Sequence, residues 1–559
     1  MTRGRRFSGA ASTAGVQRYS AASLLLRFAL ERKPSLLRFA LRFPPLSILR
    51  WLTLTAIVAG AFWLRTHDLE NRPMHADEAN QAVKLGELIE TGSYAFDPRD
   101  HHGPTLYYAG AVVARLRGER TLAQLTETTV RLVPAVFGTV SVLLIAALMS
   151  VGASPPSLPA AAMSGSSGYA PTWLGLAAAA LVAVSPPAVY FSRYFVQETL
   201  LVTFTLAAVL AALTWWRRGP LGWALAAGVS AGLMQATKAS APLFLACAVA
   251  AAITAQRLSR RPAGARLETA LAPRRWRRTI SWSLTAALVT AALHYTSFGT
   301  NLSGLGDAFT AYTHALTRFG AESGPTGHEK AWWYYLKMFG WYREGGLLWH
   351  QVAFSALAAV GLVLALKRCR HDAFFTWSAL YALLIAGAFS LFAYKTPWHV
   401  VHFIPGFALL AAGALGALAR VRGGWLVGTA LALVTVATLY QQTQRAAFLR
   451  PSDQRNPYAY VHSTPDVRKY RAAAEAARAV APHQPIRVIS EEYWPLPWYL
   501  RGMPNVGYYA TPPENVDGAL VIVAATQADA VRAQLRGRYQ ETFLGLRPGV
   551  ICILFSVEP

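Results

Sequence analysis

Acidic and histidine side chains crowd one short stretch near the N-terminal end of the chain. It opens with His75, Asp77 and Glu78, and His102 follows in the same polar segment. A carboxylate held against a hydroxyl group acts as a general base, which typically accelerates a reaction by about 10² to 10⁴. Adjacent acids on a loop are also commonly solvated charges. The pattern therefore indicates a candidate base and leaves the solvated alternative open.

A third acid stands at the start of a long apolar run. Glu198 follows Ser192 and Arg193 and leads directly into that run. A carboxylate at the edge of a bilayer is costly and commonly faces a cavity or a charged partner. An ion pair with Arg193 is the structural alternative to a role in chemistry.

Two lysines lie between apolar runs, on the side opposite to the arginine clusters. Lys238 follows Thr237, and Lys395 precedes Thr396. Membrane proteins usually concentrate Lys and Arg in their cytoplasmic loops. Because these two lysines lie on the opposite side, we expect an anionic partner such as a phosphate. Snorkelling toward lipid headgroups is the alternative.

A long polar loop at 299–349 adds His328 and Glu329, followed by the aromatic run Trp332–Tyr335. Such aromatics commonly mark the membrane interface, which is the expected role for most of them. They also stack on sugar rings. This loop is therefore a candidate binding surface as well as a membrane anchor.

A divalent metal is a further candidate near the first acids. The side chains that could hold one are His75, His101, His102, Asp77 and Glu78. No spacing among them is diagnostic of a metal site. We therefore assign no metal ligand and no cofactor, and leave the metal open.

The composition places these side chains on a membrane protein. Of the 559 residues, 54% are hydrophobic and only 14% are charged, well below the roughly 25% charged of a soluble protein. Runs of about 17 to 25 apolar residues predict membrane spans. We expect about eleven, near 46–65, 129–151, 172–190, 198–215, 221–236, 240–256, 279–298, 350–367, 373–393, 398–419 and 424–441.

The basic residues set the orientation of these spans. The 53 Lys and Arg exceed the 28 Asp and Glu, but they lie in short clusters between spans, which argues against a nucleic-acid partner. Threading eleven spans puts every cluster on the N-terminal side, which is the cytoplasmic side by the positive-inside rule. These clusters are Trp216–Arg218, Arg257–Arg278, Lys367–Arg370 and Arg420–Arg422. We expect a multi-pass protein of the plasma (inner) membrane with its C-terminal segment outside.

Domain boundaries follow from the same pattern. A basic cytoplasmic leader is expected at 1–45, with a transit peptide as the competing interpretation, and the membrane domain at 46–441. Its first external loop, 66–128, is expected to hold amphipathic helices at 76–90 and 104–117. A small external α/β domain is expected at 442–559. Its predicted elements are a helix at Asp466–Ala479 and strands at Arg487–Ser490, Ala519–Ala524 and Val550–Val557.

Four of these motifs together resemble the multi-spanning glycosyltransferases of the GT-C fold, which include protein O-mannosyltransferases and the aminoarabinose transferase that acts on lipid A. The motifs are the Asp77-Glu78 pair, Ser192-Arg193 with an acid five residues later, Thr237-Lys238, and Lys395-Thr396-Pro397. Relatives often carry Asp where this chain has Glu198. The resemblance implies an α-helical polytopic GT-C-like fold.

A narrower likeness is to the archaeal flippase activity-associated proteins, which also occur in bacteria. It rests on His75–Ala79, Asp97-Pro98 with His102-Gly103-Pro104, Gly327–Lys330, Lys395–Trp398 and Tyr493–Arg501. The family name describes an association with the flipping of lipid-linked oligosaccharides. A non-catalytic protein that binds such lipids or helps to flip them is therefore the alternative to a transferase.

The resemblance implies a sugar donor linked to polyprenyl phosphate and a glycan, lipid or protein acceptor. Asp77 would be the base, with Glu78 and Glu198 as the other candidate catalytic acids that orient the acceptor or Asp77. Residues expected to contact substrate are His75, His102, Arg193, Lys238, His328, Glu329, Lys395, Trp398, Trp494 and Trp498. An ion-coupled transporter needs charges near the bilayer midplane, whereas these acids lie at external ends.

Overall fold

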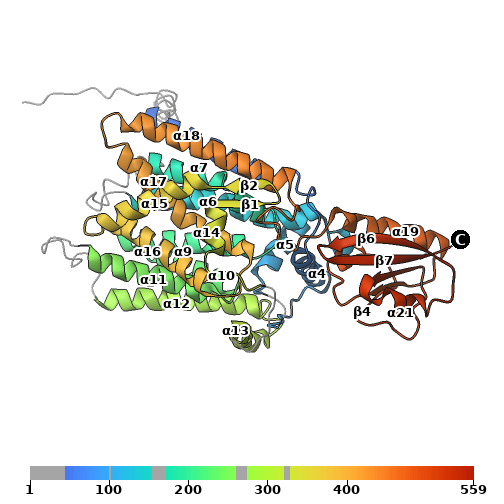
Figure 1. Ribbon diagram of the computed structural model, residues 1–559. Coiled ribbons are helices and arrows are strands. Elements are labelled where there is room, and N and C mark those ends of the chain that lie inside the picture. The colour runs from blue at the N-terminus through green and yellow to red at the C-terminus, as the bar shows by residue number, and fades with distance from the viewer. Residues whose placement is uncertain (1–44, 100–101, 154–171, 260–272, 320–327, 559) are drawn as a thin grey trace, which may run out of the picture.

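The computed structural model describes residues 45–99, 102–153, 172–259, 273–319 and 328–558 (Figure 1). A bundle of long helices forms one end of the molecule and a small sheet-containing domain forms the other. Nearly all of the leader at 1–45, together with His101 and Gly327, lies outside the described residues.

Nine of the eleven predicted spans each coincide with one helix in the described part of the chain. Seven helical segments are long and apolar enough to cross a membrane: α3 (Pro45–Thr66), α6 (Glu127–Gly152), α9 (Glu198–Arg218), α11 (Ala241–Leu258), α16 (Ala373–Leu391), η4 with α17 (Pro397–His402 and Ile404–Leu418) and α18 with η5 (Gly424–Thr443 and Gln444–Leu449). The shorter apolar helices are α7 (Trp173–Ala183), α10 (Leu221–Gln235) and α15 (Val352–Lys367). The predicted span at 279–298 corresponds to α12 (Pro273–Tyr295), whose first turn is strongly basic. The protein is thus a multi-pass membrane protein.

Two spans differ from the prediction. The range expected at 172–190 is divided into α7 and α8 (Pro186–Phe191), because Pro186 has no N–H to donate and holds Ser185 in an extended conformation. The span expected at 398–419 begins as the 3₁₀ helix η4 and becomes α-helical only at Ile404. The first of these irregular stretches closely precedes Arg193 and Glu198 in the sequence, and the second closely follows Lys395.

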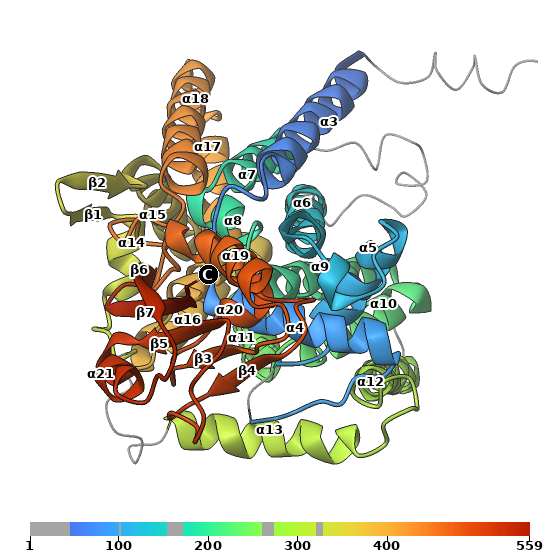
Figure 2. The same cartoon turned by 90° about the vertical axis from the view of Figure 1, so that its right-hand side faces the viewer.

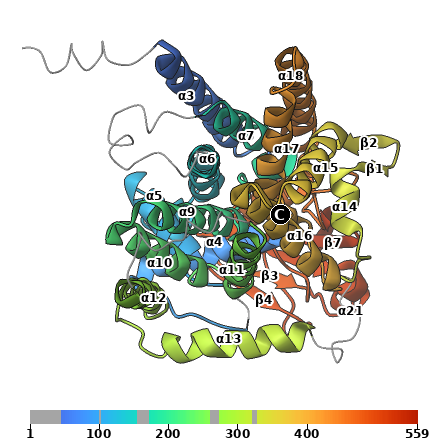
Figure 3. The same cartoon turned by 90° about the vertical axis from the view of Figure 1, so that its left-hand side faces the viewer.

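The polar loops gather at one end of the bundle. The first external loop holds α4 (Ala76–Thr91) and α5 (Thr105–Leu116), which confirms the two amphipathic helices, and a short 3₁₀ turn η1 (Leu122–Gln124) follows. The large loop holds α13 (Gly304–Phe319), α14 (Tyr334–Phe339) and a hairpin of β1 (Trp341–Glu344) and β2 (Leu347–His350). Figures 2 and 3 show α13 lying crosswise to the bundle helices.

The C-terminal domain is a five-stranded mixed sheet with helices, as expected for an α/β domain. Its strands are β3 (Ile486–Ile489), β4 (Val506–Tyr509), β5 (Leu520–Ala524), β6 (Tyr539–Arg547) and β7 (Val550–Val557), in the order β4-β3-β5-β7-β6. β3 is parallel to β4 and β5, whereas β7 is antiparallel to β5 and β6. The helical elements are η6 (Pro465–Arg468), α19 (Lys469–Val480), α20 (Leu496–Tyr499), η7 (Ala525–Gln527) and α21 (Ala528–Arg532).

Candidate functional site

Asp77 lies in the first turn of α4, where the sequence itself fixes the backbone. His75 is the residue that caps this helix: its Nδ1 accepts a hydrogen bond from the Asp77 N–H at 3.0 Å, and Glu78 Oε2 accepts from the His75 N–H at 3.2 Å. This reciprocal arrangement is a capping box. Asp77 keeps a side chain that is 47% exposed, and among the described residues no Lys or Arg nitrogen lies within 4 Å of it.

Glu78 has the opposite environment to Asp77, although it is the next residue. Its carboxylate is fully buried and accepts from Arg131 Nε at 2.9 Å, Arg131 Nη2 at 2.8 Å and the Phe195 N–H at 3.0 Å, with Arg72 Nη2 at 3.4 Å. Burial alone would raise the pKa of Glu78, but the charges of Arg131 and Arg72 lower this pKa well below its usual range. Glu78 is therefore a fixed anion that joins α4 to α6.

Arg131 extends this network into the loop before α4. Its guanidinium donates to the carbonyl oxygens of Leu69 at 2.6 Å, Arg72 at 2.8 Å and Pro73 at 3.1 Å. Arg72 in turn donates to the Arg193 carbonyl at 2.6 Å. The loop that leads to Asp77 is thus held by charge-assisted hydrogen bonds.

Histidine and aromatic rings from distant segments surround Asp77. The ring of His75 lies 5.4 Å from Tyr194 and 6.4 Å from Trp398, centroid to centroid. Trp398 lies 6.2 Å from Tyr460, and Tyr460 Oη is 2.9 Å from His328 Nδ1. Asp77 therefore stands where the first loop, the large loop, the start of η4 and the segment after η5 meet.

Both ring nitrogens of His75 are engaged. Nδ1 accepts from the Asp77 N–H, so Nε2 carries the proton and donates to the Tyr460 carbonyl at 3.0 Å. Burial lowers the pKa of His75, and the charges of Asp77 and Glu78 only partly oppose this. We infer that His75 is a neutral structural link between α4 and the C-terminal segment.

A second charged group lies at the ends of α9 and α10. Glu198, at the N-terminus of α9, forms an ion pair with Lys238, and both side chains are buried. The partner of Glu198 is thus Lys238 and not Arg193. The helix dipole of α9 also favours the Glu198 carboxylate at this position.

Histidines from two further segments lie near Lys238. His399 and His402 of η4 are within electrostatic range of Lys238, and His102 is within range of His399. The loop carrying His102 is held close because the Gly103 N–H donates to the Thr237 carbonyl at 3.1 Å. A Cβ at Gly103 would lie 2.1 Å from the Ala236 carbonyl oxygen, so this approach requires glycine.

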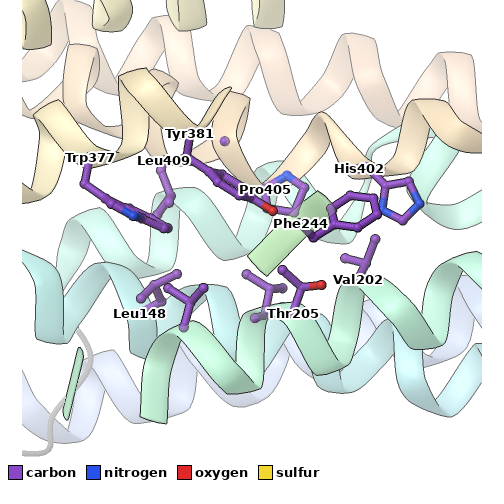
Figure 4. Close-up of a pocket in the computed structure, with 12 residues that line it drawn as sticks. Leu148, Val202, Thr205, Phe244, Trp377, Tyr381, His402, Pro405 and Leu409 are labelled. Atoms are coloured by element: carbon purple, nitrogen blue, oxygen red, sulfur yellow. The ribbon is translucent and has the colours of Figure 1, made fainter. Parts of the chain in front are cut away.

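A narrow apolar crevice opens beside this cluster (Figure 4). His402 and Phe244 line one end and Trp377 lines the other. Its walls come from α6, α9, α11, α16 and the η4–α17 segment. The His402 ring lies 4.5 Å from Phe244 and 5.7 Å from Phe389, centroid to centroid. The crevice is thus apolar along its length, and its His402 end lies toward Lys238.

Two cationic residues predicted to contact substrate have protein partners. Arg193 donates to the carbonyls of Leu64, His67 and Asp68 and stacks on Phe448. The ammonium of Lys395 donates to the Phe392 carbonyl, and burial lowers the pKa of this lysine. Arg193 therefore ties the loop before α9 to the end of α3.

The motif Tyr493–Arg501 lies where the two domains meet. Trp498 is fully buried and donates through Nε1 to Glu127 Oε1 at 2.9 Å, while Tyr499 Oη accepts from the Met74 N–H at 2.9 Å. Arg501 donates to the Leu125 carbonyl at 2.8 Å and stacks on Trp498. Trp494 is half-buried against Tyr493. The motif anchors the C-terminal domain beside the loop that carries His75.

The residues named for a metal do not fit one. Both nitrogens of His75 and both oxygens of Glu78 already have protein partners, and His101 lies outside the described residues. Among the described side chains no group of three His, Cys, Asp or Glu gathers as a metal site.

Sequence reasoning missed several residues of this site. Arg131 carried a usable signal, because an arginine inside an apolar span requires a partner. His399 and His402 stand beside a motif that was noted, four and seven residues after Lys395. Tyr460 gave no signal, since its contacts to His75 and His328 join residues 385 and 132 positions apart.

The fold is the GT-C fold. The crystal structure of ArnT from Cupriavidus metallidurans bound to undecaprenyl phosphate superposes with a TM-score of 0.59 at 14% identity, over 90% of this chain and 98% of that one. The archaeal oligosaccharyltransferase AglB from Archaeoglobus fulgidus, in complex with an inhibitory peptide and a dolichol-phosphate, gives a TM-score of 0.53 at 12% identity, over 89% of this chain and 73% of that one.

The sequence match to a known family covers a smaller part of the chain. The family described as dolichyl-phosphate-mannose-protein mannosyltransferase matches residues 168–272, which include Arg193, Glu198 and Lys238. No curated protein matches the chain. The class of fold thus rests on the structural comparisons, and the family match covers less than half of the chain.

Proposed function

We propose that the protein is a membrane glycosyltransferase that moves a sugar from a polyprenyl-phosphate donor to an acceptor on the non-cytoplasmic side. The observation that carries this proposal is the contrast at the start of α4. Asp77 is half exposed and has no cationic partner among the described residues, whereas Glu78 is buried and held by two arginines. A base must reach its substrate, and of these two neighbouring acids Asp77 is the one that a substrate can reach.

The donor would lie between Asp77 and the apolar crevice. An isoprenoid chain would lie along this apolar crevice, and Lys238, with His399 and His402, would meet the lipid phosphate at the end that His402 lines. The structures of ArnT with undecaprenyl phosphate and of AglB with a dolichol-phosphate, which share the fold, support this class of donor.

The proposed step is a single displacement. Asp77 accepts the proton of the acceptor hydroxyl while that oxygen attacks the anomeric carbon. The bond from this carbon to the phosphate oxygen breaks, and its electron pair leaves with the lipid phosphate, so the configuration inverts. Lys238 offsets the growing negative charge, an effect that is strong where water is excluded.

The other predicted site residues divide between contact and support. Trp398, His328 and Glu329 lie beside Asp77 as candidate contacts to the sugar, and His102 stands beside Lys238. Glu78 and His75 fix the backbone of Asp77, Glu198 holds Lys238, and Arg193 and Lys395 hold the loops around them. Trp494 and Trp498 belong to the C-terminal domain, where Trp498 bonds to Glu127 of α6 and the next residue, Tyr499, bonds to Met74 in the segment before α4.

The same cavity would suit an accessory protein that binds lipid-linked oligosaccharide without turnover. Reconstituted protein with a radiolabelled polyprenyl-phosphate sugar and a membrane extract as acceptor separates the two. A transferase converts donor into a product of inverted configuration and frees polyprenyl phosphate. Saturable donor binding with no released lipid phosphate would support the accessory role.

The proposed topology places the leader and the basic clusters in the cytoplasm and the C-terminal domain outside the plasma membrane. The first loop, α13 and the C-terminal domain share one end of the bundle (Figure 1). Cysteine-accessibility labelling in intact cells tests this orientation. Label at Glu475→Cys and none at Lys367→Cys is expected.

A further inference from the structure

The segment that joins η5 to the C-terminal domain returns to the Asp77 site through Tyr460. The Tyr460 carbonyl accepts from His75 Nε2 at 3.0 Å, and the Tyr460 hydroxyl lies 2.9 Å from His328 Nδ1. One residue therefore links the helix that carries Asp77 to the large external loop. These two hydrogen bonds fix the direction in which the Tyr460 ring faces.

The rings near Tyr460 form a partly open aromatic surface. Tyr460 and Trp398 are nearly perpendicular, with centroids 6.2 Å apart and an interplanar angle of 78°. His328 lies 5.6 Å from Tyr460 and 4.7 Å from Tyr394. All four side chains are only partly buried, and the neighbouring Glu329 is exposed. We call Tyr394, Trp398, Tyr460, His328 and Glu329 the aromatic platform.

The position of the aromatic platform relative to Lys238 decides which of the two substrates the platform faces. Trp398 belongs to the platform, whereas the ring of the next residue, His399, lies 5.0 Å from Phe389 and 6.4 Å from His402, which lines the crevice. A donor in the crevice and Tyr460 would therefore lie on different sides of the start of η4. Because an inverting displacement needs the attacking oxygen and the departing phosphate on opposite faces of the anomeric carbon, the acceptor would approach from the side of the platform.

We propose that the acceptor is itself a sugar, whose ring stacks on Tyr460 and Trp398 while its hydroxyl groups bond to His328 and Glu329. This inference rests on the proposed transferase function. Perpendicular aromatic faces bury the apolar side of a sugar ring, and a few polar groups set its orientation. An extended peptide is instead held by main-chain hydrogen bonds along a strand edge, and the platform consists of side-chain rings.

The acceptor class is tested with reconstituted wild-type protein, a labelled polyprenyl-phosphate sugar and two sets of acceptors. One set is a panel of alkyl glycosides, and the other is a panel of peptides rich in Ser and Thr. Transfer to at least one glycoside and none to the peptides is expected. Transfer to peptides in preference to every glycoside would overturn the proposal while leaving the transferase function intact. No transfer to either set or to a membrane extract would instead count against the function itself.

Variants of Tyr460 test the platform directly. Tyr460→Ala removes the ring, so the KM for the glycoside should rise about tenfold or more, with kcat and the Kd for polyprenyl phosphate within twofold of wild type. Tyr460→Phe keeps the ring and loses only the bond to His328, so it should recover most of the affinity for the glycoside. An unchanged KM in Tyr460→Ala would overturn the proposal.

A matched control is the neighbouring Tyr458, whose hydroxyl bonds to Gln351 Nε2 at 3.2 Å within the core. Tyr458→Phe removes one hydroxyl from the same segment and should leave the glycoside KM unchanged. If Tyr460→Ala does not fold, Trp398→Leu, which removes the second aromatic face, is measured against Tyr458→Phe. An equal glycoside KM in Trp398→Leu and Tyr458→Phe would contradict a sugar-binding platform.

Discussion

Glu78 and Glu198 are buried carboxylates with cationic partners, and their surroundings differ. Glu78 has two arginines, and both of its oxygens accept further hydrogen bonds from main-chain N–H groups. Glu198 has one lysine, and the neighbouring side chains are histidines beside a crevice. The first carboxylate is saturated by the protein, whereas the second shares its cation with an open site.

This difference teaches which pair supports the fold and which is available to a ligand. Both oxygens of Glu78 already accept several hydrogen bonds, so its arginines are not available to bind another anion. Removing one of these arginines would leave a buried charge without compensation. A single lysine beside an open crevice can turn toward a phosphate. The predictions below separate the two pairs, from the largest expected effect to the smallest.

Breaking the Glu78 network should have the largest effect on stability. Arg131→Met leaves Glu78 with only the more distant Arg72, so we expect a loss of about 3 to 5 kcal/mol in the free energy of unfolding. Thermal unfolding of the purified protein in detergent measures the change. Lys84→Gln is the control, because the Lys84–Glu87 pair is exposed and should contribute less than about 1 kcal/mol. Equal shifts in the two variants would contradict a structural role for Glu78.

Variants of the Glu198–Lys238 pair should change ligand affinity in opposite directions. Lys238→Gln should raise the Kd for polyprenyl phosphate about tenfold, since a buried charge contact of this kind contributes on the order of 1.5 kcal/mol or more. Glu198→Gln should lower that Kd, because Lys238 loses the anion that competes with the phosphate. Direct binding of labelled polyprenyl phosphate checks both. Weaker binding in both variants would show that the Glu198–Lys238 pair, like the Glu78 network, supports the fold and is not available to a ligand.

Loosening the docked C-terminal domain should have a smaller effect. Trp498→Phe loses the hydrogen bond to Glu127 and keeps most of the ring packing, so we expect a cost of about 1 kcal/mol. Hydrogen exchange should increase at residues 66–75, which contact this motif through Met74 and Tyr499. Trp494→Phe, on a half-buried ring in the same motif, is the control. Unchanged exchange in this loop would argue against coupling between the two domains.

The smallest effect is expected on acidification. Burial lowers the pKa of His75, and Arg72 adds to this while Asp77 and Glu78 oppose it. His462 also lies nearby. The folded protein thus binds fewer protons at His75 than the unfolded chain, so stability falls as the pH drops below about 6.5. His75→Asn keeps a capping side chain without titrating, and its melting temperature should depend less on pH between 7 and about 5.

Much of the fold could be predicted from the sequence because each span is a local apolar run. The helices α4 and α5 were also predictable, since their amphipathic patterns lie within single segments. The interruption at Ser185-Pro186 carried a local signal in the proline. Asp77 could be proposed as the base because its motif is short and contiguous.

The partners of the acids could not be predicted in the same way. Arg131 and Glu78 are 53 positions apart, and Lys238 and Glu198 are 40 apart. Which cation reaches which carboxylate depends on how the helices pack, and packing is not a property of a local pattern. For the same reason Arg193, which was considered as the alternative partner of Glu198, is not its partner, and Tyr460 was not found.

Turnover by Asp77→Asn at saturating donor and acceptor tests the central claim most directly. The side chain is half exposed and the change is nearly isosteric, so folding and the Kd for polyprenyl phosphate should match wild type. We predict that kcat falls by about 10² to 10⁴. A variant that binds the donor normally and turns over at the wild-type rate would show that Asp77 is not the base.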